Sequence, residues 1–270
     1  MSCLFRRAPA GALLICILLF RSGGAAAEPV TVRYTEGLVH GFLVLRTLQG
    51  DTIAAGDLSQ GTRGGLVTSR LMFRFKDGSL YDETVVFSQR GSFRLLSDHL
   101  VQKGPSFDRP MDVSIDARSG RVAVRYTDKD GKEKVETEQM ELPLDLANGM
   151  VFTLLKNIAP GVPETTVSMV AATPKPRLVK LKIVPVGQEP FSVSGVEYQA
   201  MHYVVKVEIG GVAGVVVPLL GKQPPDHHVW IIGGKTPGFV KAEGSLYLGG
   251  PPWKIELASP VWPKVAPKQP

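Results

Sequence analysis

The sequence predicts a mainly β protein: one large, curved antiparallel sheet, a half-barrel or barrel-like fold, with a single covering helix near residues 145–158. Three observations predict this class. Apolar and polar residues alternate in many short segments, and glycine-containing turns separate those segments. Only one segment shows helical periodicity, so helices cannot form a layer of their own.

The amino-terminal half contains the clearest hairpin signals. The turn Lys76-Asp77-Gly78 joins two alternating segments, and glycine supplies the positive φ that such a turn needs. Residues 117–120 and 128–131 predict two further hairpins by the same reasoning. The segments predicted as strands are 31–34, 41–48, 67–75, 80–88, 111–116, 121–127 and 132–137.

The one helical segment is residues 145–158, where Leu146, Met150, Leu154 and Ile158 recur at spacings of four. Asp145 suits an N-cap, and Ala159-Pro160-Gly161 ends the pattern. An amphipathic helix of this kind is the natural cover for the concave face of the sheet.

The carboxy-terminal half returns to strands. We interpret residues 28–258 as a single domain, in which the proline-rich stretch 160–176 is an internal connection. The alternative is that this stretch links two domains. Residues 259–270 carry four prolines and predict a loosely held tail. The expected strands are 165–171, 178–184, 198–209, 229–232, 239–248 and 253–257.

Residues 1–27 have the layout of a secretory signal peptide. Arg6 and Arg7 precede the apolar run 8–20, and the alanines at 25–27 offer a cleavage site before Glu28. The apolar run is too short to span a bilayer as a mature helix. We therefore expect an exported protein of the bacterial periplasm or cell envelope.

Both cysteines, Cys3 and Cys16, lie inside the predicted signal. The mature chain would then hold no disulfide, thiolate metal site or c-type haem, and we expect no cofactor. Lipidation at Cys16 is not favoured, because Ile15 stands where processing requires a small residue.

The charge balance indicates no nucleic-acid partner. The chain has 31 Lys and Arg against 25 Asp and Glu, and three arginines but no acidic residue lie in 1–27, which leaves a net charge of +3. A mild excess spread along the chain is not a basic patch. No later stretch reaches 18 uninterrupted apolar residues, so we expect no transmembrane helix after signal removal.

Two groups of residues could carry function. The run 212–220 has no charge and no polar side chain; it is either a strand buried on both faces or part of an apolar cavity wall. Tryptophans in late strands either fill a barrel end or line an apolar site. The candidate ligand-binding residues are Val215, Val217, Leu219, Trp230 and Trp253.

The densest polar group is Asp226-His227-His228. Neighbours in a strand point to opposite faces, so His227 and His228 cannot easily share a metal ion, whereas Asp226 and His228 can point the same way. Zinc would need a further ligand from elsewhere. We predict no metal site and read the group as a polar strand entrance, with Asp226 and His228 as weak candidates.

The late strands resemble known exported proteins. His228-Val229-Trp230, residues 239–244 and Trp253-Lys254-Ile255-Glu256-Leu257 are similar to an uncharacterised bacterial family, over about the last 80 residues. The whole pattern, a cysteine-free exported β protein with one helix, resembles the periplasmic half-barrel proteins typified by the lipoprotein carrier LolA. This resemblance implies a binder or carrier of apolar molecules, with the ligand on the concave face under the helix.

Three functional hypotheses follow. The first is a non-enzymatic envelope protein that binds a lipid or another apolar ligand on a concave β face. The second is a structural or assembly protein of the envelope, with the run 212–220 as an interface for a protein partner. The third is a metal-dependent hydrolase that uses Asp226, His228 and a carboxylate such as Glu243.

Overall fold

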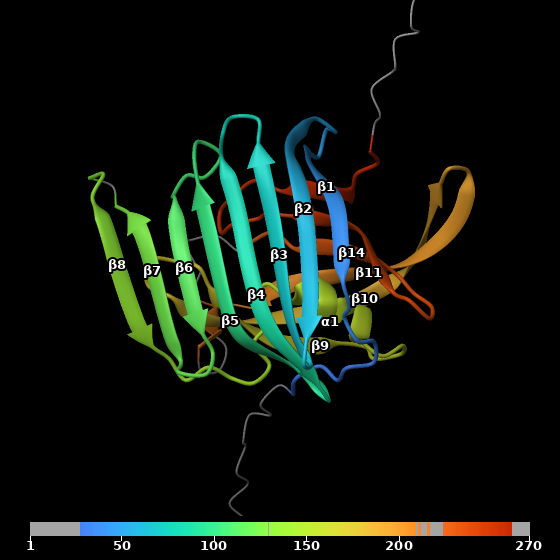
Figure 1. Ribbon diagram of the computed structural model, residues 1–270, viewed down its shortest axis with the longest axis horizontal. Coiled ribbons are helices and arrows are strands. Elements are labelled where there is room, and N and C mark those ends of the chain that lie inside the picture. The colour runs from blue at the N-terminus through green and yellow to red at the C-terminus, as the bar shows by residue number, and fades with distance from the viewer. Residues whose placement is uncertain (1–27, 129, 209, 212–214, 217–223, 261–270) are drawn as a thin grey trace, which may run out of the picture.

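One antiparallel sheet of 14 strands dominates the computed structural model, which describes residues 28–128, 130–208, 210–211, 215–216 and 224–260. The sheet is curved and remains open (Figure 1). Its strand order is β8-β7-β6-β5-β4-β3-β2-β1-β16-β15-β14-β11-β10-β9. The predicted fold class is confirmed.

The elements in chain order are β1 (Val39–Thr47), β2 (Thr52–Arg63), β3 (Leu66–Phe75), β4 (Leu80–Arg90), β5 (Ser92–Lys103), β6 (Met111–Asp116), β7 (Arg121–Thr127), β8 (Glu133–Gln139), α1 (Val151–Asn157), β9 (Thr165–Ala171), β10 (Arg177–Val193), β11 (Val196–Glu208), β12 (Gly210–Gly211), β13 (Val215–Val216), β14 (His227–Ile232), β15 (Gly238–Gly244) and β16 (Trp253–Leu257). The pair β12 and β13 forms a separate small sheet.

Hairpins build most of the sheet, as the turn signals predict. Gly78 adopts a φ of 85° between β3 and β4, and Gly131 adopts 76° between β7 and β8. Two strands of the 14-stranded sheet were not predicted from the sequence, β2 and β5. Both carry polar residues on the inner face, Gln60 in β2 and Asp98 in β5, which interrupt the alternation that identifies a strand.

Three predicted strand ranges differ clearly from the structure. The strand predicted at 178–184 is the much longer β10, Arg177–Val193, and two other predicted strands are shorter than expected. Residues 31–34 form only an isolated bridge, Thr31 to Ser92, and residues 239–248 end as a strand at Gly244. Near residues 31–34 the chain pairs with the start of β5 through two backbone bonds: the Val32 N–H donates to the Gly91 carbonyl, and the Phe93 N–H donates to the Val30 carbonyl.

The helix is shorter than the sequence predicts and begins at Val151 instead of near residue 145. Gly149 has a φ of 63°, a left-handed conformation that a helix cannot contain. Residues 145–148 instead run along the edge of β9, with Leu146 paired to Ser168. The Ser168 N–H donates to the Asp145 carbonyl, and the Ala147 N–H donates to the Ser168 carbonyl. Asp145 is therefore no N-cap; Met150 stands at that position without a side-chain cap.

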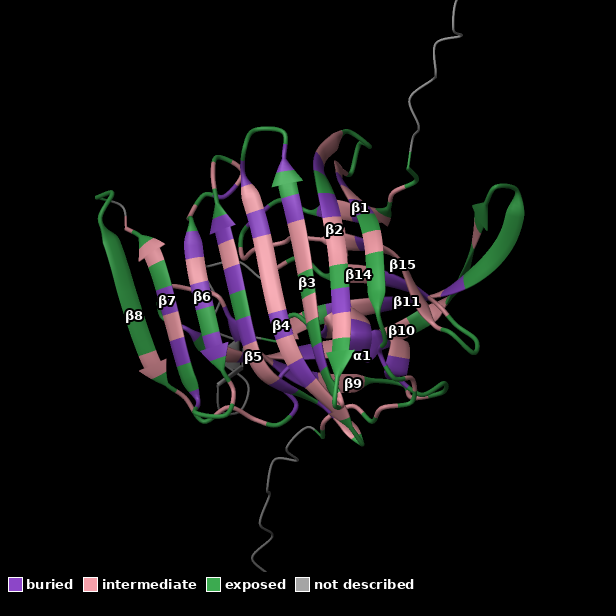
Figure 2. Ribbon diagram, in the orientation of Figure 1, coloured by how far each residue is buried: buried purple, intermediate pink, exposed green. Residues whose placement is uncertain are grey.

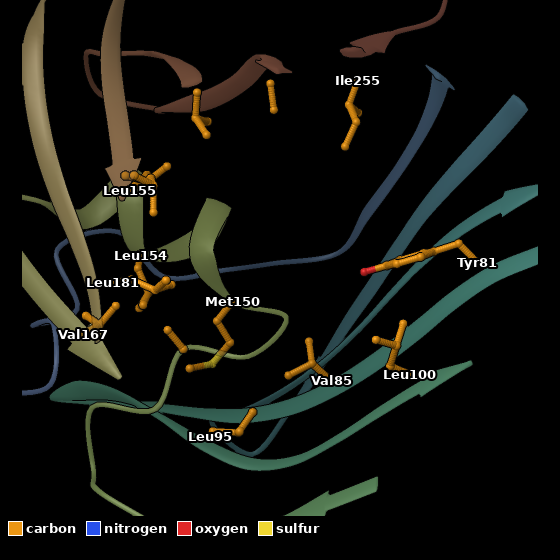
Figure 3. Packing of buried hydrophobic residues seen from close by; sticks show 14 of the residues in the cluster. Tyr81, Val85, Leu95, Leu100, Met150, Leu154, Leu155, Val167, Leu181 and Ile255 are labelled. Carbon is orange, nitrogen blue, oxygen red and sulfur yellow. The ribbon is translucent and has the colours of Figure 1, made fainter. Parts of the chain in front are cut away.

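The core lies between the inner faces of the two halves of the sheet, with the helix segment inserted beside them. Figure 3 shows Met150, Leu154, Val85 and Leu181 facing a common interior, from the helix and its N-cap, from β4 and from β10. Several large side chains there are almost completely buried, namely Leu45, Phe73, Phe87, Phe93, Met150 and Leu155. The buried positions alternate along the strands (Figure 2).

The first and last strands in chain order, β1 and β16, are neighbours within the sheet. Leu45 of β1 lies opposite Ile255 of β16 in the antiparallel ladder. The amino-terminal series β1–β8 and the carboxy-terminal strands are thereby joined into one continuous sheet. Among the helices of the described residues, none is long and apolar enough to cross a membrane.

Candidate functional site

Trp230 lies on the outer face of β14, in a layer of polar side chains. His202 of β11 stacks on its ring, with centroids 4.4 Å apart and an interplanar angle of 7°. From β15, on the other side of β14, Lys241 places its Nζ 3.8 Å from the ring centroid. The Trp230 Nε1–H donates to Glu189 Oε2 at 2.7 Å. The side chains of His202 and Lys241 therefore contact the indole ring, and Glu189 accepts its only N–H donor.

His228 lies beside this stack and contacts a second histidine. Its Nδ1 is 2.9 Å from His202 Nε2, so one of these two nitrogens carries the shared proton. His202 Nδ1 lies 2.8 Å from Glu189 Oε1, but the geometry of this contact is not that of a hydrogen bond. The pKa of Glu189 is lowered, first by the Trp230 N–H and also by His202.

The residues suggested for a metal-dependent hydrolase do not assemble. Asp226 pairs with Lys206 at 3.5 Å, and Glu243 pairs with Lys241 at 3.0 Å. His227 points to the opposite face from His228, as strand geometry predicts, and burial lowers its pKa. Within the described part of the chain, no group of three or more His, Cys, Asp or Glu side chains could hold a metal ion.

The other candidate ligand-binding residues are scattered. Trp253 belongs to the core, where its ring lies 5.4 Å from that of Phe75 and 6.1 Å from that of Tyr247. Val215 lies in the short strand β13. Val217 and Leu219 lie outside the described residues. The structure thus does not bring the five candidates together at one described site.

A half-open pocket of about 380 Å³ lies on the inner face of the sheet, beside the helix; we call it the helix-side pocket. Met201 of β11 faces Ile231 of β14 in the ladder, and both line it. Tyr203, two positions along β11, shares their face and adds its ring. The apolar residues of the lining are Leu155, Ile158, Pro160, Met201, Ile231 and Pro237.

Arg33 stands at the edge of this pocket and is fixed by the end of the helix. Its backbone N–H donates to Asn157 Oδ1 at 2.9 Å, and its Nη1 donates to the Ile158 carbonyl at 2.8 Å. Its guanidinium carbon lies 5.3 Å from the Tyr34 ring centroid. Burial raises the pKa of Tyr203, and the positive charge of Arg33, which lines the same pocket, opposes that change.

A second cation of the lining, Lys156, is already neutralised. Its Nζ is 2.5 Å from Glu36 Oε1, and both side chains are largely buried. Gln60 donates to the other Glu36 oxygen at 2.9 Å, which fixes the segment between Arg33 and β1 against the sheet. The helix-side pocket therefore has a rigid wall made from the beginning of the described chain.

A larger hollow of about 920 Å³ opens on the outer face of the sheet. Arg63, Arg90 and Arg118 line it, and Arg90 donates to the Gly64 carbonyl at 2.7 Å. It lies away from the core and opens to water. Small-molecule sites usually enclose the ligand against apolar walls. The helix-side pocket fits that description better, despite its smaller volume.

The inner face also holds two carboxyl groups, that of the buried Asp98 and that of the half-buried Glu83. Glu83 of β4 and Asp98 of β5 are diagonal neighbours in the ladder, and Tyr81 donates its hydroxyl to Glu83 Oε2 at 2.9 Å. Burial raises the pKa of both acids, and the charge of Glu83 raises that of Asp98 further. Asp98 Oδ1 has no hydrogen-bond partner among the described residues.

Sequence reasoning missed the residues of the helix-side pocket. The alternation of β11 and β14 was a usable signal, because it places Met201, Tyr203 and Ile231 on faces that alternate with those of His202 and Trp230. No local signal could place Arg33 beside Ile158, since 125 positions separate them.

Comparisons with known proteins identify no family. No family model matches the chain, and no curated protein matches it. Among solved structures, it is similar to the crystal structure of a beta-barrel-like protein of domain of unknown function DUF1849 from Brucella abortus. The TM-score is 0.46 at 10% sequence identity, over 83% of this chain and 98% of that one.

Proposed function

We propose that this chain is an exported, non-enzymatic protein of the bacterial envelope that binds a lipid or another apolar small molecule on the concave face of its sheet. The signal-peptide pattern of residues 1–27 supports export. We place the binding site in the helix-side pocket instead of at the tryptophans that the sequence suggested. Most of the run 212–220 lies outside the described residues.

One observation carries this proposal: a half-open pocket with mainly apolar walls lies between the inner face of the sheet and the helix. Ligand pockets commonly have volumes of about 300–1,000 Å³ and combine apolar walls with a few polar groups. The volume of about 380 Å³ lies in this range. The deeper interior is filled by side chains such as Phe73 and Phe87, so the ligand would occupy this end of the fold.

Filling the pocket tests the proposal. Met201 is only half-buried, so Met201→Trp adds bulk to the pocket without replacing a core residue. The neutral dye Nile red should bind the wild-type protein with a fluorescence increase, and Met201→Trp should reduce its affinity at least about tenfold, the value of a few lost apolar contacts. Met72→Trp, at a half-buried methionine on the outer face of β3, is the matched control.

Equal dye binding by Met201→Trp and the wild type would refute the pocket as the site. Organic extraction of protein purified from the envelope, followed by mass spectrometry, gives an independent answer. A lipid should accompany the wild type and the Met72→Trp control and be depleted from Met201→Trp.

Export is tested separately. Removal of residues 1–27 should retain the protein in the cytoplasm, and the envelope form should begin at Glu28 by amino-terminal sequencing. A full-length protein that keeps Met1 and stays in the cytoplasm would contradict this part of the proposal.

A structural or assembly role is the second candidate, and one observation favours it. The ends of β10 and β11 extend beyond their neighbours as a two-stranded arm (Figure 1). Val186, Val193 and Val196 on this arm are each more than half exposed. Sedimentation of the wild type and of Val193→Asp tests whether the arm mediates self-association; monomers in both cases would remove this argument.

A further inference from the structure

The charge in the helix-side pocket is not balanced by the protein. Lys156 is paired with Glu36, so these two groups cancel. Arg33 forms no ion pair with any carboxylate of the described residues, and the remaining lining residues are neutral. One positive charge therefore stands over a mainly apolar pocket. A positive charge beside low-dielectric walls attracts an anion more strongly than the same charge in open water.

The Arg33 guanidinium is oriented but not fully used. The bond from Nη1 to the Ile158 carbonyl uses one of its five N–H donors, and the backbone bond to Asn157 fixes the base of the side chain. The donors on Nε and Nη2 contact no acceptor among the described residues. Two such donors in a planar fork match the two oxygens of a carboxylate, or two oxygens of a phosphate.

A second donor belongs to the same pocket as this fork. The Tyr203 ring lines the same pocket, and its hydroxyl makes no hydrogen bond to another described residue. The hydroxyl can donate to an anion held by Arg33. Beyond these two groups, Met201 and Ile231 continue the wall with apolar side chains, and Gln188, opposite Met201 in the ladder, adds a neutral polar group. The pocket thus has a cationic end with hydrogen-bond donors and a neutral, mainly apolar remainder.

We infer that the ligand is a single-chain amphiphile with an anionic head group, a carboxylate or a phosphate monoester. The head group would be bound by Arg33 and Tyr203, and the hydrocarbon chain would lie against Leu155, Met201 and Ile231. This inference rests on the proposed function, because it names the class of ligand for the same pocket. The volume favours one chain over a two-chain phospholipid.

Four ligands that each contain twelve carbon atoms test the head group: laurate, dodecyl phosphate, dodecanol and dodecylamine. Each is titrated into the full-length mature protein below its micelle concentration, with displacement of Nile red as the measurement. Laurate or dodecyl phosphate should bind at least about tenfold more tightly than dodecanol, as expected for a charge-assisted pair of hydrogen bonds, and dodecylamine should bind most weakly. The tighter of the two anions identifies the head group.

Arg33→Gln should lower the affinity for the preferred anion about tenfold and leave that for dodecanol unchanged. Arg33→Lys keeps the charge but not the planar fork, so its affinity for the preferred anion should lie between those of the wild type and Arg33→Gln. Arg177→Gln is the matched control, because Arg177 is an exposed arginine that does not line the pocket. Thermal unfolding of each variant verifies that it is folded.

The outcomes separate the two proposals. If dodecanol or dodecylamine binds the wild type as tightly as the anions, or if Arg33→Gln binds the anions unchanged, the head-group inference is refuted while the proposed function stands. If none of the four ligands displaces Nile red and Met201→Trp does not alter dye binding, the proposed function itself is refuted.

Discussion

Asp98 shows how a single residue can oppose the stability of its own fold. Its side chain is 3% exposed, one carboxyl oxygen has no partner among the described residues, and Glu83 lies diagonally opposite. Burial and then the charge of Glu83 raise the pKa of Asp98 well above its ordinary value. The folded state therefore favours the protonated acid, whereas the unfolded chain releases the proton near pH 4.

This arrangement predicts a specific pH dependence. The contribution of Asp98 to stability is complete below about pH 4 and is lost as the pH rises through its folded pKa. Asp98→Asn cannot ionise, so it should raise the free energy of unfolding by about 1–3 kcal/mol at pH 8 and change it little at pH 4. Urea unfolding at both values measures the difference.

Asp130→Asn is the control, because Asp130 is exposed in the turn between β7 and β8. It should leave stability within about 0.5 kcal/mol of the wild type at either pH. A variant at Asp98 that is less stable than the wild type at pH 8 would mean that the ionised carboxylate is favourable in the fold.

Gly56 of β2 is a residue whose missing side chain is required by packing. A Cβ at this position would lie 2.4 Å from Cε1 of Phe73, which is fully buried. Gly56→Ala should therefore displace the ring and lower the free energy of unfolding by about 1–3 kcal/mol. Gly61→Ala on the same strand meets nothing within 4 Å and should have little effect. Denaturant unfolding of the two variants compares them directly; equal stabilities would contradict the packing argument.

At the scale of elements, the two edges of the sheet differ. The edge strand β8 is exposed along almost its whole length and carries Glu133, Glu136 and Glu138. Charged side chains on an edge discourage pairing with another chain. The other edge strand, β9, is covered by residues 145–148, which pair with it in parallel. The segment that the sequence predicts as the first half of a helix is used to cover this edge.

Asn148 holds this cover in place. Its side chain accepts from the Val170 N–H and donates to the Val170 carbonyl, each at 2.9 Å. Asn148→Ala removes both bonds and should lower the free energy of unfolding by about 1–2 kcal/mol. It should also accelerate hydrogen exchange at the Val170 amide, while the Val179 amide in β10 serves as the internal reference. Unchanged exchange at Val170 would show that the edge is protected by other contacts.

At the scale of the whole molecule, the sheet joins the two halves of the chain. β1 pairs with β16, and one core cluster contains residues from Leu43 to Ile255. We therefore predict a single cooperative unfolding transition, as the one-domain interpretation requires. All three tryptophans lie beyond residue 229, so their fluorescence reports on the carboxy-terminal half, whereas circular dichroism reports on all strands. Different midpoints for the two signals would support the two-domain alternative instead.

The sequence predicts structure correctly where a few neighbouring residues decide it, and less well where contacts with distant residues decide it. The turn at Asp77-Gly78 and the opposite orientations of His227 and His228 follow from backbone geometry over a few residues, and the structure has both. The helix prediction identified a real apolar stripe, because Leu146, Met150 and Leu154 are all buried. Its extent was wrong, because burial at spacings of four does not distinguish a helix from a turn that is held against a strand.

The sequence by itself determined the β class and most of the hairpins, because each depends on short-range periodicity, turn chemistry or composition. The export signal in residues 1–27 stays a prediction. Only the tertiary structure decided that β16 lies beside β1, that Glu189 binds Trp230, and that Arg33 reaches the helix-side pocket. These contacts join positions far apart in the chain. They arise from the packing of the complete sheet, which minimises exposed apolar surface for the whole molecule, and no local pattern specifies which distant partners that packing brings together.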